Sequence, residues 1–501
     1  MNDVMSNLQH LFGKDQTREK WEKLLKGPLL EKPLTPTLKV SSFSNEKKLT
    51  SKNNFLEKRE KTKFLSFYPY EELEKGKTLL ESDKGLTTSS FFFPNSNIIN
   101  KEMMAFAKNN SNHFFYFSCE KKDHLERINK LYEKEYKGNL NNIFLLVQEE
   151  LLKEEIKIPF HCHFDSRHYY SLGLSEEDDL SFHLEARKRV KKNHPKVSFL
   201  STMMLPEHQL LAAAKCLLWR NYFAEGDLLH VMPNIRSFDE RDSWNNLLRQ
   251  TSVFSSAFIG EANFVSGVPF NFLSNEINLE SWSMSKNIYA VLNEEGNLAK
   301  GSLAGSRALE EVKNKLGQLV EESNKKEEKD YRILANDNWE KEIERVRCRK
   351  KSLVGINQFA SNIEEDKKNK SSLYSLNETE KSYYYGQSKE KSFIYPHYQD
   401  LFKQFWNRKK VEIELLFDGE LSDWRKEISY VKNILTLGEI TPLVKPLYSS
   451  KSSFILFSKN KDLKEKSDKC FLYGEDIQQS SDIIDFLERV WIALGVSHEK
   501  K

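Results

Sequence analysis

The sequence predicts an α/β protein with a large domain followed by a smaller one, and three observations support this fold class. Between residues 56 and 365, short runs of aromatic and branched residues alternate with helical stretches. Residues 366–408 are charged and rich in Ser and Tyr, without a hydrophobic period, which is typical of a surface linker. Strand and helix patterns then resume over residues 409–501.

Six predicted strands carry the alternation in the large domain. They are FLSFY (64–68), SSFFF (89–93), HFFYFS (113–118), KIPFHCHFD (157–165), KVSFLS (196–201) and LLHVM (228–232). Helical patterns lie between them, as in residues 139–155 and 206–225. A (β/α)8 barrel fits the length of the domain, although an open doubly wound sheet has the same alternation.

The smaller domain contains three predicted strands, VEIELLF (411–417), SSFILFS (452–458) and KCFLYG (469–474). Its predicted helices, 422–438 and 481–495, each end at a glycine, the residue preferred just after a helix. At the other end of the chain, residues 1–55 predict a short helix and an extended arm that wraps a partner or the next domain.

Composition excludes several classes of protein. The 77 Lys and Arg residues are balanced by 74 Asp and Glu, giving a net charge of +3 and no reason to expect nucleic acid. Five widely spaced cysteines without a CxxC pair argue against a disulfide framework. The sequence has neither an apolar signal core nor a run of roughly 20 apolar residues, so we expect a cytoplasmic protein without membrane contact.

In residues 241–271, Asp242, Asn245 or Asn246, Arg249 and the Val-Pro-Phe ending at 268–270 make up the first of three segments that resemble the methylmalonyl-CoA mutase family. The family has an Asp-Pro-Tyr-x-Asn-x-x-Arg run here, and the Val-Pro-Phe ending is similar to that of its small subunits. Residues 281–312 run in register with two later family stretches. Residues 347–359 resemble the closing barrel strand, through Val354, Gly355, Asn357 and Phe359. The two ends, TREKWEKLLKG and 468–496, resemble those of the small subunit.

This resemblance implies a coenzyme-A-binding TIM-type barrel followed by a flavodoxin-like cobalamin domain. It also implies a heterodimer whose large subunit binds adenosylcobalamin and interconverts methylmalonyl-CoA and succinyl-CoA. In such enzymes the cofactor supplies the chemistry, while the protein binds and orients it.

The turn after residues 411–417 departs from the catalytic pattern of the family, which has Asp-x-His-x-x-Gly there. Glu420 stands in place of the cobalt-ligating His, and Asp423 in place of the Gly. A carboxylate is a hard oxygen ligand and replaces an imidazole poorly. We therefore expect a degenerate cobalamin-type domain that binds no cofactor.

The barrel part also departs from the catalytic pattern. The family's His-x-Gln-x-Ser strand end falls on His230, Met232 and Asn234, so only the histidine is kept. Two family arginines become Ser283 and Lys286. His230 is therefore the one weak catalytic candidate. It is either a remnant general acid or a histidine that is satisfied at a strand end.

A second group of residues could hold a metal. FHCHFDSRHYY places His161 and His163 on one side of a strand, with Cys162, Asp165 and His168 nearby. The alternative is a set of incidental histidines at a strand end. Because no further Cys or His constellation supports the cluster, we predict no metal site.

These observations predict a small subunit that supports a catalytic, cobalamin-binding partner and is not itself active. The first alternative is a divergent, active acyl-CoA mutase that binds cobalamin in another way. The second is a binding module that acts outside this reaction.

Overall fold

The computed structural model describes most of the chain between residues 62 and 495. The described residues are 62–69, 88–93, 105, 108–109, 114–119, 126, 130, 143–147, 161–171, 173–193, 198–206, 208–222, 227–273, 277, 279–296, 298, 306–325, 329–359, 381, 384, 397–406, 408, 411–418, 420–446, 454–458, 469–477 and 481–495. The helix and arm predicted over residues 1–55 lie outside them.

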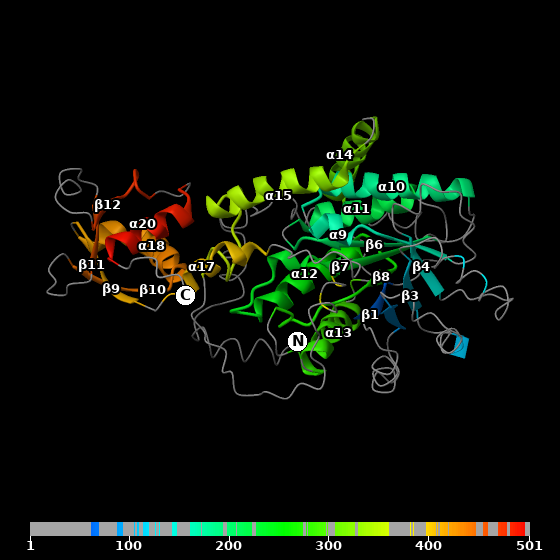
Figure 1. The fold of residues 1–501 in the computed structure, drawn as a ribbon, viewed down its shortest axis with the longest axis horizontal. Helices are drawn as coiled ribbons and strands as arrows, with labels where there is room; N and C mark the ends of the chain where they lie inside the picture. Colours follow the sequence, from blue (N-terminus) through cyan, green and yellow to red (C-terminus); the bar gives the residue numbers. More distant parts are fainter. Residues whose placement is uncertain are drawn as a thin grey trace, which may run out of the picture. The chain divides into compact units, whose positions relative to one another are not determined.

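Two compact units divide the chain. The first is Met1–Glu60 with Ser306–Ala308, of which only the last three residues are described. The second, Lys61–Gly305 with Leu309–Lys501, contains two sheets of parallel strands, which Figure 1 shows with their helices. The fold is α/β, as predicted.

Within the described residues the larger sheet contains eight strands, and consecutive strands pair in parallel in chain order. They are β1 (Lys63–Pro69), β2 (Thr88–Phe93), β3 (Phe114–Cys119), β4 (Ile143–Val147), β5 (His161–Asp165), β6 (Ser198–Met204), β7 (Leu228–Pro233) and β8 (Phe264–Val265). The last strand returns to the first through the pairs Lys63↔Phe264 and Phe64↔Val265, so the sheet closes on itself. This pairing is that of a barrel and not of an open sheet.

Two of these strands differ from the prediction. β4 lies inside residues 139–155, which the sequence predicted as a helix. The run Ile143–Val147 is apolar at every position, and short apolar runs do not distinguish a strand from a helix. β8 has only two residues and gives no periodic signal.

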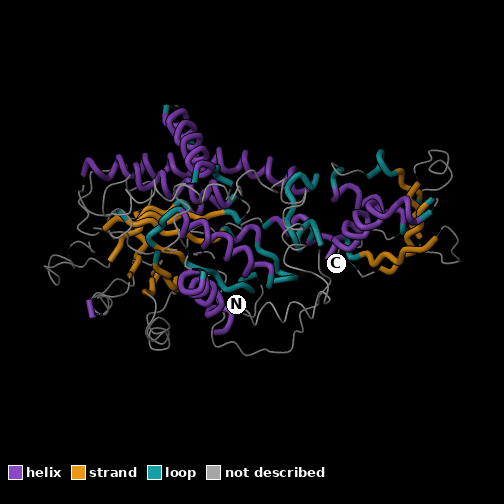
Figure 2. Tube along the Cα trace, turned by 180° about the vertical axis from the view of Figure 1, so that it is seen from behind, coloured by secondary structure: helices purple, strands orange, loops and turns teal. Residues whose placement is uncertain are grey.

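The described helices of this part of the chain come after β5 and the later strands, and Figure 2 shows them in purple beside the orange strands. They are α9 (Arg167–Ser171), α10 (Glu176–Asn193), α11 (Gln209–Tyr222), η4 (Ile235–Ser237), α12 (Asn245–Ile259), α13 (Leu279–Ala290), η5 (Val291–Glu295), α14 (Arg307–Asn324) and α15 (Tyr331–Arg347). α12 packs on β7 and buries Val253, Phe254, Ala257 and Phe258, the spacing of a helix with one apolar face. Asp330 caps the N-terminus of α15 by accepting from the amides of Arg332 and Ile333.

Residues 347–359 do not form the closing strand that the resemblance implied. They make a compact loop, in which Val354 and Gln358 form an isolated bridge and the Gly355 amide donates to the Gln358 carbonyl. Gly355 has φ +83°, a left-handed conformation that interrupts a strand. The ring is instead closed by β8.

The smaller sheet has four strands in the order β10-β9-β11-β12, all parallel. Its elements are β9 (Val411–Phe417), η8 (Leu421–Trp424), α18 (Arg425–Leu437), β10 (Ile440–Pro446), β11 (Phe454–Ser458), β12 (Cys470–Leu472) and α20 (Ile483–Ala493). The sequence missed β10, because Pro442 and Pro446 weaken its strand signal. An edge strand tolerates proline, since one side needs no ladder hydrogen bonds.

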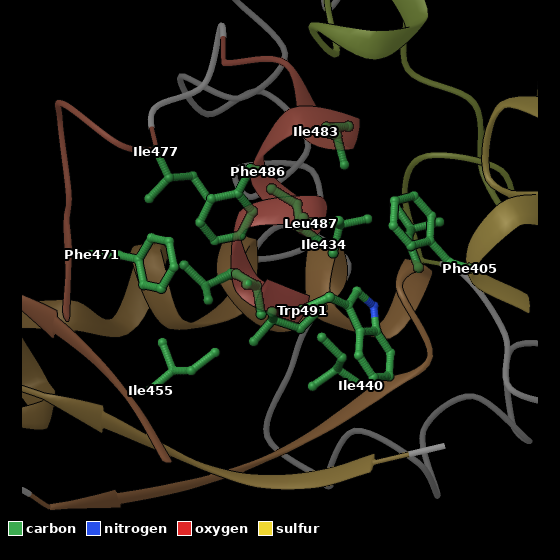
Figure 3. Close-up of a cluster of buried hydrophobic side chains, with 14 of the residues drawn as sticks. Phe405, Ile434, Ile440, Ile455, Phe471, Ile477, Ile483, Phe486, Leu487 and Trp491 are labelled. Atoms are coloured by element: carbon green, nitrogen blue, oxygen red, sulfur yellow. The ribbon is translucent and has the colours of Figure 1, made fainter. Parts of the chain in front are cut away.

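A hydrophobic core lies between the smaller sheet and its two helices. Figure 3 shows Ile434, Phe486 and Trp491 of α18 and α20 facing Ile455 and Phe471 of the strands. All of these side chains are buried. Full burial of each such side chain contributes roughly 1.5–3 kcal/mol, so this core is the main source of stability for the smaller sheet.

The end of the predicted linker belongs to the same core, which corrects the prediction of a surface linker. Residues 397–406 form η7 (Tyr398–Leu401) and α17 (Lys403–Trp406). Tyr398, Phe402 and Phe405 are fully buried. Their spacing of four and three residues is that of a helix face, and the surrounding charges masked it. Of the rest of this range, the described residues include only 381, 384 and 408.

None of the helices in the described part of the chain combines the length and the apolar character that crossing a bilayer requires.

Candidate functional site

His230, the predicted catalytic candidate, is a buried residue of β7, with 1 % of its surface exposed. Its Nε2 lies 2.7 Å from Ser266 Oγ, and this hydroxyl donates in turn to the Leu65 carbonyl. A hydroxyl has one proton, so the Ser266 oxygen accepts from His230 and Nε2 carries the hydrogen. His230 Nε2 is thus engaged in a hydrogen-bonded link from β7, through Ser266 just after β8, to β1, and this nitrogen could act as a general acid only if that hydrogen bond broke.

Met232 and Asn234, the other two residues of this strand end, also have hydrogen-bond partners within the protein. Met232 Sδ accepts a hydrogen bond from Arg167 Nη1 over 3.2 Å, and both side chains are fully buried. Asn234 Oδ1 accepts from the Arg236 amide and so caps η4. The three residues that resemble a catalytic strand end therefore each serve the internal structure.

The residues of the first family-like segment meet at Asn246. Its Oδ1 accepts from the Asp239 amide at 2.9 Å and from Arg249 Nη1 at 2.8 Å. Its Nδ2 donates to the carbonyls of Asp239 and Phe270, both at 2.8 Å. Asn246, and not Asn245, is thus the buried residue that organises this region.

Arg249 connects this region to the third family-like segment, because its Nη2 donates to the Val354 carbonyl at 2.6 Å. Asn357 fixes the same loop by donating to the carbonyls of Val346 and Lys351 and accepting from the Leu353 amide. The structure therefore brings together two segments that are about a hundred residues apart, but it uses their polar groups for backbone contacts.

A buried charged cluster lies between α10, α11 and β6, and the sequence did not predict it. Lys215 Nζ pairs with Asp179 at 2.9 Å and contacts Glu176. Thr202 Oγ1 donates to Asp179 at 2.7 Å, and Tyr170 donates to Glu176. All five side chains are buried, so each charge is stabilised mainly by the opposite charge beside it and not by water.

The pKa values in this cluster reflect the balance between burial and the neighbouring opposite charges. Burial alone would raise the pKa of Asp179, but the Lys215 ammonium, with a smaller contribution from His183, lowers it below its ordinary value. Burial also disfavours the charged Lys215, yet Asp179 and Glu176 raise its pKa above the ordinary value. Both groups are therefore charged at neutral pH, as expected of a structural ion pair and not of a proton-transfer group.

The possible metal ligands are divided between β5, which contains residues 161–165, and α9, which contains His168. The structure describes the backbone of these residues, whereas their side chains lie outside the described part. Among the side chains that are described, no group of three His, Cys, Asp or Glu residues could hold a metal ion.

The turn after β9 is closed by its own residues. Asp418 Oδ2 accepts from Ser458 Oγ at 2.9 Å, which joins the carboxyl ends of β9 and β11. Trp424 donates to the Asp418 carbonyl at 2.8 Å and is 2 % exposed, packed between Phe417 and Tyr473. Glu420, at the position of the family's histidine, is exposed and precedes η8.

This donor set does not fit a corrinoid. A flavin or cobalamin in such a sheet lies outside the carboxyl ends of the strands, where the chain order reverses between β9 and β11. Here that position holds a Trp indole and an Asp–Ser hydrogen bond, and the described residues of 411–495 include no imidazole.

No protein-family model matches the chain. No curated protein matches it either.

Proposed function

We propose that this chain is the small, non-catalytic subunit of a cytoplasmic, heterodimeric methylmalonyl-CoA-mutase-like enzyme. Its TIM-type barrel and flavodoxin-like unit support a large subunit that binds adenosylcobalamin and interconverts methylmalonyl-CoA and succinyl-CoA. The closed ring of eight parallel strands, followed by a parallel sheet of order β10-β9-β11-β12, supports the architecture.

One observation carries the non-catalytic part of the proposal. The turn that would present a cobalt ligand has an exposed carboxylate, Glu420, and is filled by the buried Trp424. Both the missing imidazole and the occupied space oppose corrinoid binding by this chain.

Exposed apolar side chains support a partner. Trp244 is 59 % exposed, Leu248 71 % and Phe359 64 %. Trp244 and Leu248 lie one helical turn apart at the start of α12, and Arg249 ties this helix to the loop that contains Val354. Trp244 and Leu248 therefore expose an aromatic and an aliphatic group on neighbouring turns, and Trp is enriched where partners bind.

The proposal is tested by co-expressing a tagged version of this chain with a mutase-like large subunit encoded in the same genome. We expect the two chains to co-purify in a one-to-one ratio at moderate ionic strength, because the proposed contact is mainly apolar. Recovery of the tagged chain alone, folded and monomeric, would contradict the proposal.

A further inference from the structure

Arg236 is a buried cation that forms no direct ion pair with a carboxylate of the described residues. It lies in η4, at the carboxyl end of β7, and 3 % of its surface is exposed. Its Nη2 donates a long hydrogen bond of 3.5 Å to the Tyr170 carbonyl, and the guanidinium also hydrogen-bonds to the Tyr398 side chain. Its Nε has no hydrogen-bond partner in the described structure. A guanidinium has five N–H donors, so Arg236 retains unused capacity for an acceptor.

Two aromatic rings compensate only part of the burial cost. The Arg236 guanidinium carbon lies 4.0 Å from the centroid of the Trp339 ring and 5.9 Å from that of Tyr398. A desolvated cation–π contact contributes about 2 kcal/mol. Burial of an ion costs several kcal/mol, and this cost lowers the pKa of Arg236 from its ordinary value. A negative ligand would therefore be favoured beside this guanidinium.

A second buried cation lies next to the same phenol. Lys351 is 7 % exposed, and its Nζ donates to the Tyr398 hydroxyl at 3.2 Å. It also pairs with Glu342 at 2.6 Å, a carboxylate that Arg345 shares. The Tyr398 oxygen thus contacts both cations, and the Glu342 carboxylate, which pairs directly with Lys351, also acts on Arg236 from a greater distance.

A short segment of the chain covers this position. We call residues 397–403 the strap. His397 Nδ1 donates to the Ile235 carbonyl at 3.1 Å, and Gln399 Oε1 accepts from the Glu240 amide at 2.8 Å. Lys403 pairs more loosely with Glu240, at 3.6 Å. Besides these polar contacts, the strap is held by two of its own side chains, Tyr398 and Phe402, which are fully buried.

We propose that Arg236 and Lys351 form a phosphate-binding site that the strap closes in this structure. The Tyr398 hydroxyl occupies the position of one phosphate oxygen. Phosphate suits the site better than a monocarboxylate, because two cations converge there and the arginine fork matches phosphate geometry. The carboxyl ends of the seventh and eighth strands are also where barrel proteins frequently bind phosphate.

The test uses the full chain and follows its thermal unfolding in inorganic phosphate, against chloride at equal ionic strength. Gln399→Ala removes two contacts of the strap to Glu240 and leaves both cations in place. We expect phosphate at about ten times its Kd to raise the Tm of this variant by about 2 °C more than chloride does. Coenzyme A and pyrophosphate, used next, distinguish a free phosphate from one carried on a larger molecule.

Two further variants make the test specific. Adding Arg236→Met to Gln399→Ala should abolish the phosphate effect, whereas adding Arg489→Met should preserve it, because Arg489 pairs with Asp476 on the smaller sheet. Lys403→Met loosens the strap at a half-exposed position and replaces Gln399→Ala if that variant does not fold. A folded strap variant without a phosphate-specific shift, or a shift that persists without Arg236, would overturn the proposal. Neither result depends on whether the chain pairs with a large subunit.

Discussion

Gly355 is required by its backbone conformation and by its neighbours. Its φ is +83°, and an added Cβ would lie 1.8 Å from Asp239 Oδ2. Asp239 is itself buried, and burial raises the pKa of its carboxyl. We predict that Gly355→Ala lowers the free energy of unfolding by about 3 kcal/mol, from left-handed strain and overpacking together.

Gly474→Ala is the matched control for this prediction. Gly474 also has a positive φ, +101°, but an added Cβ would meet no atom within 4 Å. Strain alone predicts a loss of about 1 kcal/mol there. Urea unfolding of both variants would show the difference, and equal losses would mean that the Asp239 contact is unimportant.

His397 predicts a dependence of stability on pH. Burial lowers its pKa to about 4, and Lys403 and Arg236 act in the same direction against Asp400. In the unfolded chain the histidine titrates near its ordinary value of about 6.5. The stability linked to neutral His397 is therefore complete above about pH 6.5 and is lost as the pH falls toward 4.

Substitution of His397 isolates its contribution to the pH dependence of stability. We expect wild type to lose up to about 3 kcal/mol relative to His397→Gln between pH 7 and pH 4, measured by urea unfolding at each pH. Parallel curves for the two proteins would show that His397 does not titrate in this range.

The sequence located single residues better than it located their partners. A local pattern picked out His230 and either Asn245 or Asn246, and the structure gives His230 and Asn246 defined hydrogen bonds. The Lys215 cluster was missed, because its members come from a strand and three helices and no local spacing links Lys215 to its carboxylates. Ion pairs between different elements depend on how a strand and its neighbouring helices pack, and no short sequence motif shows that packing.

At the scale of elements, one pair of substitutions tests whether the end of the predicted linker belongs to the core of the smaller sheet. Phe405 is fully buried in the core of the smaller sheet, whereas its neighbour Gln404 is exposed. We predict that Phe405→Ala lowers the free energy of unfolding by about 3–5 kcal/mol, from lost burial and the cavity left behind. Gln404→Ala should change it by less than about 0.5 kcal/mol. Similar small effects at both positions would restore the linker interpretation.

Helix ends were predicted well where a glycine adopts the left-handed conformation, and less well elsewhere. α20 ends before Gly495, which has φ +76°. At the end of α18, however, the left-handed residue is Glu439 and not Gly438. Glu439 is buried and pairs with Arg241 at 2.7 Å, so a distant ion pair holds a conformation that local sequence would assign to glycine.

At the scale of the whole molecule, the exposed apolar residues of α12 make the partner surface testable. We predict that Leu248→Asp lowers recovery of the large subunit at least about tenfold, because a charge would be buried in the contact. Leu248 is exposed, so the Tm of the isolated chain should stay within about 1 °C of wild type.

Ile333→Asp provides the control, since Ile333 is 58 % exposed on α15. It introduces the same charge at a similarly exposed aliphatic position, and it should leave the pairing unchanged. Loss of pairing in the control but not in Leu248→Asp would place the contact on another face.

The visible spectrum of the purified chain with added cobalamin, alone and paired with the large subunit, tests the central claim most directly. Exposed Glu420 and buried Trp424 predict no corrinoid on the isolated chain and about one per pair in the complex. Uptake of one corrinoid by the isolated chain would contradict this account and identify the chain as a cofactor-binding enzyme.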